Sequence, residues 1–239
     1  MSGWAAKRFW TQASAVPCDG GFTVHLDARP VRTPAKTPLV VPSLALAQAI
    51  AAEWDAQQGM VRPATMPFTR MANSALDKVA PQQAVVVAEV ARFGATDLLC
   101  YRATGPIDLV ALQAADWDPL LDWAAEALQA PLNVTTGIVP VDQPGPSLAR
   151  LTDAVAAHSP FGLVALHDLT SIAGSLVLGL AVVSGRLTPA QAFDLSRIDE
   201  DWQARQWGQD EEAAEAAALK ARAMDEAGRF LVLGRPASA

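Results

Sequence analysis

The sequence predicts an α+β protein in which a small antiparallel β-rich N-terminal domain precedes a larger, mostly α-helical domain. In the first forty residues, turn formers alternate with short runs of period two, whereas apolar residues recur at helical spacing from Ser43 onward. The chain has 239 residues, of which 51% are hydrophobic and 18% are charged, so it can bury a core of globular size. We place the β-rich domain, with one or two helices, at residues 1–90 and the helical domain at 91–239.

A strand is predicted at residues 22–26, directly after the turn former Gly20-Gly21. Apolar Phe22, Val24 and Leu26 alternate there with polar residues, which is the pattern of a half-buried strand. Two further short β-type runs follow at 31–33 and 39–41. Together these runs predict a small antiparallel sheet.

Helix signals then follow one another along the chain. Ser43 can cap a first helix that stops at Gly59, and Pro81 can occupy the first turn of a second. Asp118-Pro119 has the form of an N-cap followed by a proline at the first helical position, which predicts a helix start there. After a break rich in proline and glycine, the helical spacing resumes at Leu148.

The longest apolar tract runs from Leu163 to Val183 and is long enough to cross a bilayer. It carries His167 and Asp168 near its start and two glycines within it, so we interpret it as buried helices and expect no insertion into a membrane.

The last third of the chain has strong capping signals. Thr188 and Gln191 form a capping box around Pro189, which predicts a helix from Pro189 to about Trp207, ending at Gly208. Asp210 is then expected to cap a final helix that reaches about Ala227.

Several classes of function are disfavoured. A net charge of −7 and a pI near 4.9 argue against nucleic acid as a partner. The sequence has no P-loop, no Rossmann glycine motif and no metal-binding spacing around its three histidines or its two cysteines, Cys18 and Cys100. We therefore expect no cofactor and no metal ion.

The expected location follows from the cysteines and the N-terminus. Two cysteines in no disulfide pattern favour a reducing compartment. The N-terminus shows no secretory signal and no transit peptide. The expected location is the cytoplasm of a bacterium, or the mitochondrial matrix if the chain is a processed eukaryotic form.

Acidic residues concentrate in residues 199–215, where seven acids and one base, Arg205, give a formal charge of −6. One interpretation is a solvated helix face, with Asp210, Glu211 and Glu212 favourably placed at a helix N-terminus. Another is a small hydrolase-like enzyme that uses paired carboxylates from this cluster.

A single helix over 189–207 would be apolar on two sides. Ala192, Leu195, Ile198 and Trp202 share one face, whereas Phe193, Ala204 and Trp207 lie opposite with Glu200 between the faces. Such a helix is either sandwiched inside a bundle or available to a partner. The spacing alone leaves both possibilities open.

Long segments of the chain resemble one protein family over nearly its full length and in the same order. The segments are Lys7-Arg-Phe-Trp10, Gly21-Phe-Thr-Val24, Leu26-Asp27, Arg32-Thr-Pro-Ala-Lys36, Pro38-Leu-Val-Val-Pro42, Ala52-Glu-Trp-Asp55, Met66-Pro67, Thr69-Arg70, Asp97-Leu-Leu-Cys-Tyr-Arg102, Trp117-Asp-Pro-Leu-Leu-Asp-Trp123, Gly174-Ser-Leu-Val-Leu178, Ser196-Arg-Ile-Asp-Glu-Asp-Trp-Gln203, Gln206-Trp-Gly208 and Asp210-Glu-Glu212. The family is that of the assembly chaperones specific for the alpha subunit of the catalytic head of F-type ATP synthase.

The resemblance implies a chaperone rather than an enzyme. Such a protein would bind the free alpha subunit and shield its subunit interface until the beta subunit replaces it. Combined with the acidic cluster and the two-sided helix, it leads us to expect a partner-binding surface made of Phe193, Asp199, Glu200, Asp201, Trp202, Trp207, Asp210, Glu211 and Glu212.

Overall fold

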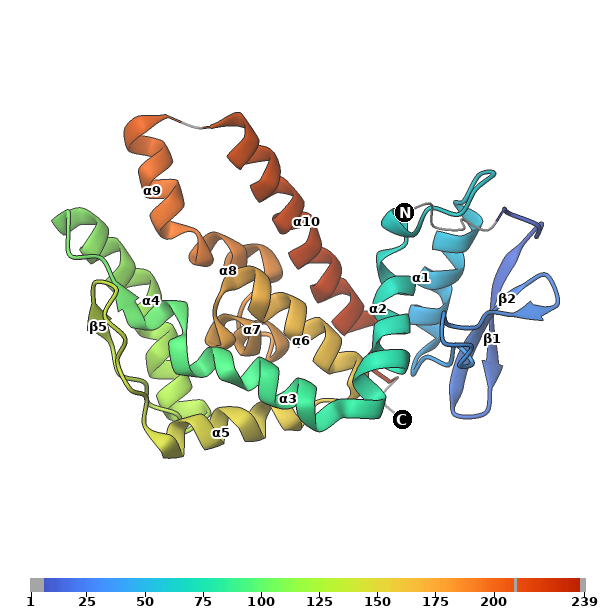
Figure 1. The fold of residues 1–239 in the computed structure, drawn as a ribbon, viewed down its shortest axis with the longest axis horizontal. Coiled ribbons are helices and arrows are strands. Elements are labelled where there is room, and N and C mark those ends of the chain that lie inside the picture. Colours follow the sequence, from blue (N-terminus) through green and yellow to red (C-terminus); the bar gives the residue numbers. More distant parts are fainter. Residues whose placement is uncertain (1–6, 209, 237–239) are drawn as a thin grey trace. The chain divides into compact units, whose positions relative to one another are not determined.

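The structure is a computed structural model that describes residues 7–208 and 210–236 (Figure 1). It divides into two compact units. The first comprises residues 1–83, 160–164 and 229–239, and the second comprises 84–159 and 165–228. The predicted α+β class is confirmed, with a small antiparallel sheet near the N-terminus and helices after it. The domain boundary that the sequence places at residue 90 stays a prediction.

The sheet of the first unit has three strands in the order β1-β2-β3. Strands β1 (Ala13–Cys18), β2 (Gly21–Leu26) and β3 (Arg29–Pro30) are antiparallel, and Ala13 pairs with Leu26. Val24 and Leu26 are buried beneath helix α1, as the alternation predicted.

Strand β1 was not predicted, because Ala-Ser-Ala-Val-Pro-Cys holds a proline and a single β-branched residue. It is an edge strand, where proline is tolerated. Conversely, the runs at 31–33 and 39–41 form isolated bridges outside the named strands, such as Phe22 with Val41 and Arg32 with Pro38.

Helix α1 (Leu44–Asp55) starts as predicted, because the Ser43 hydroxyl accepts a hydrogen bond of 3.0 Å from Leu46 N. It ends four residues before the predicted stop at Gly59. At this end the Arg8 guanidinium donates to the carbonyl oxygens of Asp55 (2.6 Å) and Gln57 (2.8 Å), so these carbonyls are satisfied from outside the helix.

The carboxylate of Glu53 on α1 caps the next helix, α2 (Pro67–Ser74). It accepts hydrogen bonds from Phe68 N at 2.7 Å and from Thr69 N at 2.8 Å. An anion at a helix N-terminus is favourable, so this contact joins α1 to α2. After α2 the chain stays helical, with local π and 3₁₀ turns, through residue 82.

The second unit is built of helices with a two-stranded parallel sheet at its margin. Its helices are α3 (Gln83–Ala91), α4 (Ile107–Ala127), α5 (Gly145–Ala156), α6 (Pro160–Ala173), α7 (Leu176–Val183), α8 (Pro189–Ser196), α9 (Ile198–Trp207) and α10 (Glu211–Leu233), of which the ends of α3, α6 and α10 belong to the first unit. The parallel strands are β4 (Tyr101–Arg102) and β5 (Thr135–Thr136). Short 3₁₀ turns at Arg92–Thr96 and Leu98–Cys100 complete the second unit, and the turn at Pro63–Thr65 belongs to the first.

Helix α7 lies in the core of this unit, with residues 176–182 all buried. Its N-terminus is held by the fully buried carboxylate of Asp97, which accepts hydrogen bonds from Ser175 Oγ (2.7 Å), Val177 N (3.0 Å) and Leu99 N (3.1 Å). Burial raises the pKa of Asp97 despite these donors. Burial and the charge of Asp97 raise the pKa of the Cys100 thiol to about 12.

The apolar tract from Leu163 to Val183 is divided between α6 and α7, as expected, with a turn at Gly174 whose φ is +68°. The described helices include none long and apolar enough to cross a membrane.

One predicted helix start was wrong. Helix α4 begins at Ile107 and carries Pro119 in its interior, whereas the sequence placed a start at Asp118-Pro119. The buried stripe of Leu109, Gln113, Trp117 and Leu120 continues through the proline. Burial of that stripe outweighs the roughly 3 kcal/mol that an interior proline costs.

Candidate partner-binding surface

The predicted surface begins on helix α8, whose N-terminus has the expected capping box. Thr188 N donates to Gln191 Oε1 at 2.9 Å, and Gln191 N donates to Thr188 Oγ1 at 3.2 Å. Phe193 lies on this helix but is only 8% exposed, with the Arg197 guanidinium 5.6 Å from its ring centre. Its side chain therefore belongs to the packing of the unit and is not part of the exposed surface.

The single helix predicted over 189–207 was wrong, because the chain bends at Arg197 (φ −116°, ψ 13°) between α8 and α9. Trp117 Nε1 on α4 donates to the carbonyl oxygen of Leu195 at 2.9 Å, and this carbonyl would otherwise accept from Asp199 N in a continuous helix. The two apolar faces predicted for a single helix over 189–207 therefore do not continue from α8 to α9.

The acids on α9 have different environments. Asp199 is half-buried and accepts a hydrogen bond of 2.6 Å from Gln113 Nε2 on α4. Asp201 pairs with Arg197 at 3.3 Å, whereas Glu200 is exposed. Asp199 thus anchors α9 to α4, and Glu200 is the acid of this turn that faces solvent without a partner among the described residues.

The two tryptophans of α9 also differ. Trp202 is half-buried, whereas Trp207 at the last position of the helix is 81% exposed. Burying a large aromatic side chain releases more free energy than burying a smaller one. A tryptophan exposed in the free protein can therefore contribute strongly to binding when a partner covers it.

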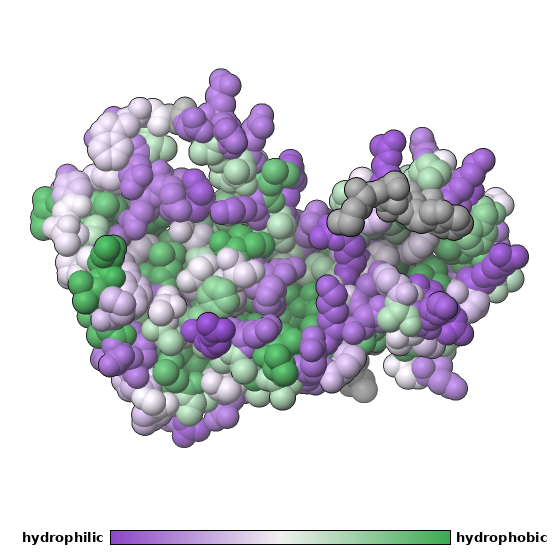
Figure 2. Space-filling model, in the orientation of Figure 1, coloured by the Kyte–Doolittle hydropathy of each residue, from purple (hydrophilic) through white to green (hydrophobic). Residues whose placement is uncertain are grey.

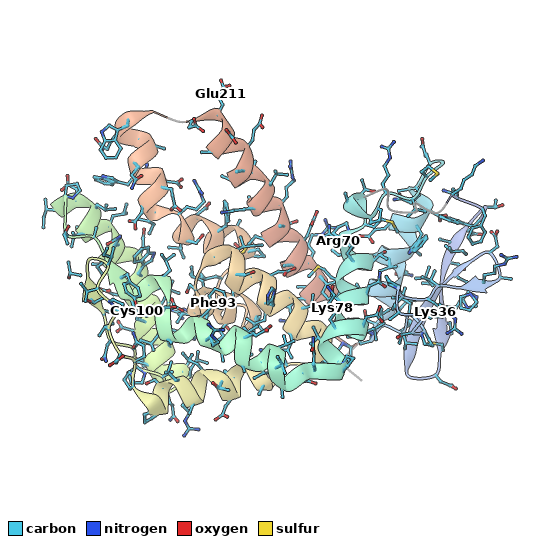
Figure 3. The ribbon with its side chains drawn as sticks, in the orientation of Figure 1. Lys36, Arg70, Lys78, Phe93, Cys100 and Glu211 are labelled. Carbon is cyan, nitrogen blue, oxygen red and sulfur yellow. The ribbon has the colours of Figure 1, made fainter. Side chains whose placement is uncertain are left out.

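Helix α9 ends at Trp207, and Gly208 follows as its C-cap with a φ of +93° that suits glycine. Asp210 caps α10 as predicted, because its carboxylate accepts a hydrogen bond of 2.8 Å from Ala213 N. Glu211 and Glu212 are exposed in the first turn, and Glu211 extends away from the helix (Figure 3). Helix α10 continues six residues beyond Ala227 because its buried stripe extends through Met224, Ala227 and Phe230.

A groove of about 470 Å³ lies between α9 and the first half of α10. The two helices diverge from their connection (Figure 1), and hydrophilic side chains lie over both of them (Figure 2). Small side chains form much of its lining, namely Ala204 on α9 and Ala213, Ala214, Ala216 and Ala217 on α10. Glu200, Asp201, Trp207 and Asp210 also line it.

The structure therefore brings together most of the predicted residues. Glu200, Asp201, Trp207 and Asp210 share the groove, Glu211 and Glu212 continue from it, and Asp199 and Trp202 lie half-buried on α9. Arg197, Lys220 and the alanine face of α10 were missed. The alanine-rich run Ala213–Ala218 is the signal that the sequence offers, but alanines indicate high helix propensity and do not by themselves indicate a surface.

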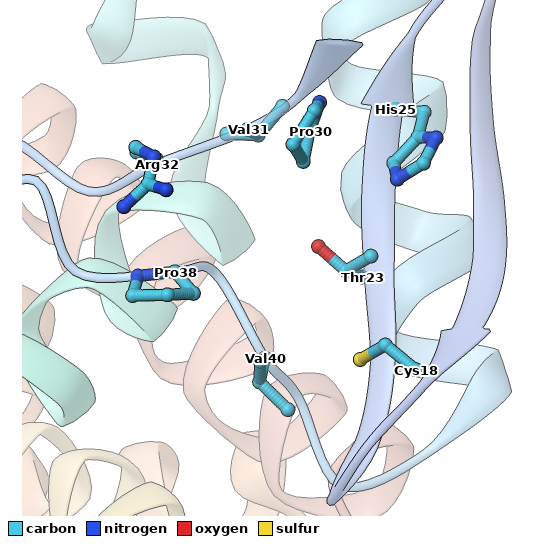
Figure 4. Close-up of a pocket in the computed structure, with 8 residues that line it drawn as sticks. All are labelled: Cys18, Thr23, His25, Pro30, Val31, Arg32, Pro38 and Val40. Carbon is cyan, nitrogen blue, oxygen red and sulfur yellow. The ribbon is translucent and has the colours of Figure 1, made fainter. Parts of the chain in front are cut away.

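A second, smaller pocket of about 230 Å³ lies in the first unit (Figure 4). Thr23 and His25 lie along one face of β2, with Cys18 of β1 nearby and Val31 and Val40 opposite. Over the described part of the chain, no three histidine, cysteine or acidic side chains are grouped so that they could hold a metal ion.

The chain is similar to solved structures over nearly its whole length and to a chaperone family over its first half. The model of the ATP12 chaperone protein family matches residues 7–125. Atp12 from Paracoccus denitrificans is 52% identical, with a TM-score of 0.93 over 98% of this chain and 100% of the other. The Atu1473 protein of Agrobacterium tumefaciens is 44% identical, with a TM-score of 0.90 over 95% of this chain and 85% of the other.

A more distant relative extends the comparison to a mitochondrial protein. The mitochondrial protein atp12 of Schizosaccharomyces pombe is 24% identical over 221 residues, which cover 87% of this chain and 76% of the relative. Together with the 52% identity to a solved Atp12 over almost the complete chain, these similarities show that the protein belongs to the ATP12 chaperone family.

Proposed function

We propose that this protein is an assembly chaperone of F-type ATP synthase that binds the free alpha subunit of the catalytic head and shields its interface until the beta subunit replaces it. The observation that carries the proposal is Trp207, which is 81% exposed at the edge of a groove bordered by carboxylates in a member of the ATP12 chaperone family. The proposed location is the bacterial cytoplasm, or the mitochondrial matrix for a processed eukaryotic form.

The physical task suits such a surface. A subunit destined for a ring exposes apolar interface area before its neighbours arrive, and that area promotes wrong association. An aromatic anchor can cover part of the area, while a charged rim selects the partner and speeds encounter. Glu200 lines the groove together with Trp207, and Glu211 and Glu212 supply further exposed charge in the first turn of α10.

A light-scattering assay tests the chaperone function. Purified free alpha subunit is diluted from denaturant with and without an equimolar amount of this protein. We expect the protein to keep the alpha subunit in solution. The same assay with free beta subunit in place of the alpha subunit is the comparison. If the protein leaves the turbidity of the alpha subunit unchanged, the proposal is overturned.

A charge-reversal variant tests the surface. We expect Glu200→Lys, Glu211→Lys and Glu212→Lys together to weaken capture at least tenfold without changing the helical circular dichroism, because like charges would replace complementary ones. The matched control reverses three exposed acids elsewhere in the same unit, Asp122, Glu126 and Asp153. If the two triple variants capture the alpha subunit equally well, Glu200, Glu211 and Glu212 are not part of the binding surface.

The arrangement of the acids favours binding over the hydrolase-like alternative. A hydrolase would enclose a pair of carboxylates in a cavity, where burial tunes their pKa values. Glu200, Asp210, Glu211 and Glu212 are all exposed. Spread along two helices at an open surface, they suit the recognition of a partner better than acid–base chemistry.

A further inference from the structure

The groove between α9 and α10 has the form of an incomplete helix packing. Ala204 on one side and Ala213, Ala214 and Ala217 on the other present only methyl groups to the space between the helices. Small side chains normally allow two helices to approach closely, yet here they border a groove of about 470 Å³. The space is therefore available to side chains from another chain.

The first half of α10 does not depend on filling that space. None of the described residues 211–220 is buried, and the helix there is supported locally by the Asp210 cap, the acids of its first turn and its alanines. The alanine face can thus remain exposed in the free protein without loss of the helix.

The size of the groove limits what can enter it. Its volume lies toward the lower end of the roughly 300–1,000 Å³ that is typical of ligand pockets. A few apolar side chains from one face of a helix would fit, whereas a folded domain would not. A helix laid in a groove between two others is a recurrent mode of peptide recognition.

The charges select the kind of helix. Arg197 is neutralised by Asp201 at 3.3 Å, which leaves Glu200 and Asp210 as the acids of the lining and Lys220 as its remaining base. Exposed Glu211, Glu212 and Glu215 adjoin the Asp210 end. The whole segment 199–215 has a formal charge of −6, so it attracts a basic occupant and repels an acidic one.

From this geometry we infer that the groove binds an amphipathic helix of the client, with apolar side chains facing the alanines and Trp207 and with lysine or arginine residues flanking them. The inference rests on the proposed function, because it names the part of the captured subunit that occupies this site. Trp207 would cover the apolar side of the helix, and Glu200 and the acids at the start of α10 would pair with its basic residues.

A pair of neighbouring substitutions tests the site. Ala217 lines the groove, whereas the next residue, Ala218, is exposed on α10 and is not part of the lining. We expect Ala217→Phe to fill the groove and weaken binding of purified alpha subunit at least tenfold, and Ala218→Phe to change it less than twofold. Thermal unfolding of both variants controls for folding, and Ala214→Phe provides a second filling variant.

The outcomes separate this inference from the proposed function. If the wild-type protein captures alpha subunit and the filling variants bind as well as Ala218→Phe, the groove assignment is wrong and the chaperone function stands. If the wild-type protein captures no alpha subunit, the proposed function fails and the groove assignment with it.

Peptides test the chemistry of the occupant directly. Overlapping peptides that cover the alpha subunit are assayed for binding by fluorescence anisotropy at 50 and 500 mM salt. The expected binders carry apolar residues at helical spacing with adjacent lysine or arginine, lose affinity at high salt and bind Ala217→Phe more weakly. Binders that are acidic, or whose affinity does not depend on salt, would overturn the assignment.

Discussion

Helix α7 and the first half of α10 belong to the same unit but differ in how far their residues are buried. Residues 176–182 of α7 are all buried, whereas none of the described residues 211–220 of α10 is. The valines and the glycine of α7 have low helix propensity, and this segment is helical because the core surrounds it. In the first half of α10, by contrast, the alanines and the Asp210 cap support the helix without help from the core. A helix of the second kind can keep its side chains free for a partner.

The largest expected effect is at the end of α7. Asp97→Ala should lower the free energy of unfolding by about 3 kcal/mol or more, because it leaves buried donors of Ser175, Val177 and Leu99 without their acceptor. Urea unfolding measures the change. A loss below about 1 kcal/mol would show that α7 does not depend on this carboxylate.

A smaller effect is expected inside the packing of α7 on α6. A Cβ on Gly179 would lie 2.4 Å from Thr170 Oγ1 and 3.4 Å from Thr170 N, so Gly179→Ala should lower the free energy of unfolding by about 1–2 kcal/mol despite the better helix propensity of alanine. Gly145→Ala on α5 is the control, since a Cβ there meets nothing within 4 Å. Equal unfolding midpoints for both variants would contradict the tight packing.

The pH dependence of stability provides a third comparison. Because the folded-state pKa of Asp97 is raised above 3.8, its contribution is complete below pH 3.8 and is lost as the pH rises through the folded-state pKa. The stability of the wild type relative to Asp97→Asn should therefore decline with rising pH in that window, by at most about 1.4 kcal/mol per pH unit. Urea unfolding of both proteins from pH 3 upward measures the difference in their free energies of unfolding. If the wild type instead gains stability over Asp97→Asn as the pH rises, the prediction is wrong.

The smallest effect on stability is expected at the exposed end of α9. Trp207→Ala should change the free energy of unfolding by no more than about 0.5 kcal/mol, because little of the side chain is buried. The same substitution should weaken capture of the alpha subunit about tenfold, as for an interface anchor. A large loss of stability with unchanged capture would place Trp207 among the packing residues instead.

Local signals predicted the starts of several elements correctly. Ser43, the Thr188–Gln191 capping box and Asp210 all make the hydrogen bonds expected of them. Such bonds join residues three positions apart, so the information lies within one turn of helix. The alternation in β2 is similarly local.

The candidate site was predictable in composition but not in shape. The acids and Trp207 are visible as a cluster in the sequence, whereas the groove exists only because α9 leaves α8 at Arg197. Phe193 illustrates the same limit, since its spacing fits a surface and its surroundings bury it. The angle between two helices depends on what each packs against, which spacing does not encode.

The sequence by itself therefore determined the α+β class, the helix caps, the acidic character of residues 199–215 and the family. Only the tertiary structure decided where α4 begins, where α8 ends and which side chains of α9 meet solvent. The Trp117 indole donates a hydrogen bond to the Leu195 carbonyl, 78 positions along the chain, and the Gln113 amide donates one to Asp199, 86 positions along. Contacts over such separations form only when the core brings the helices together, and they override what neighbouring residues prefer.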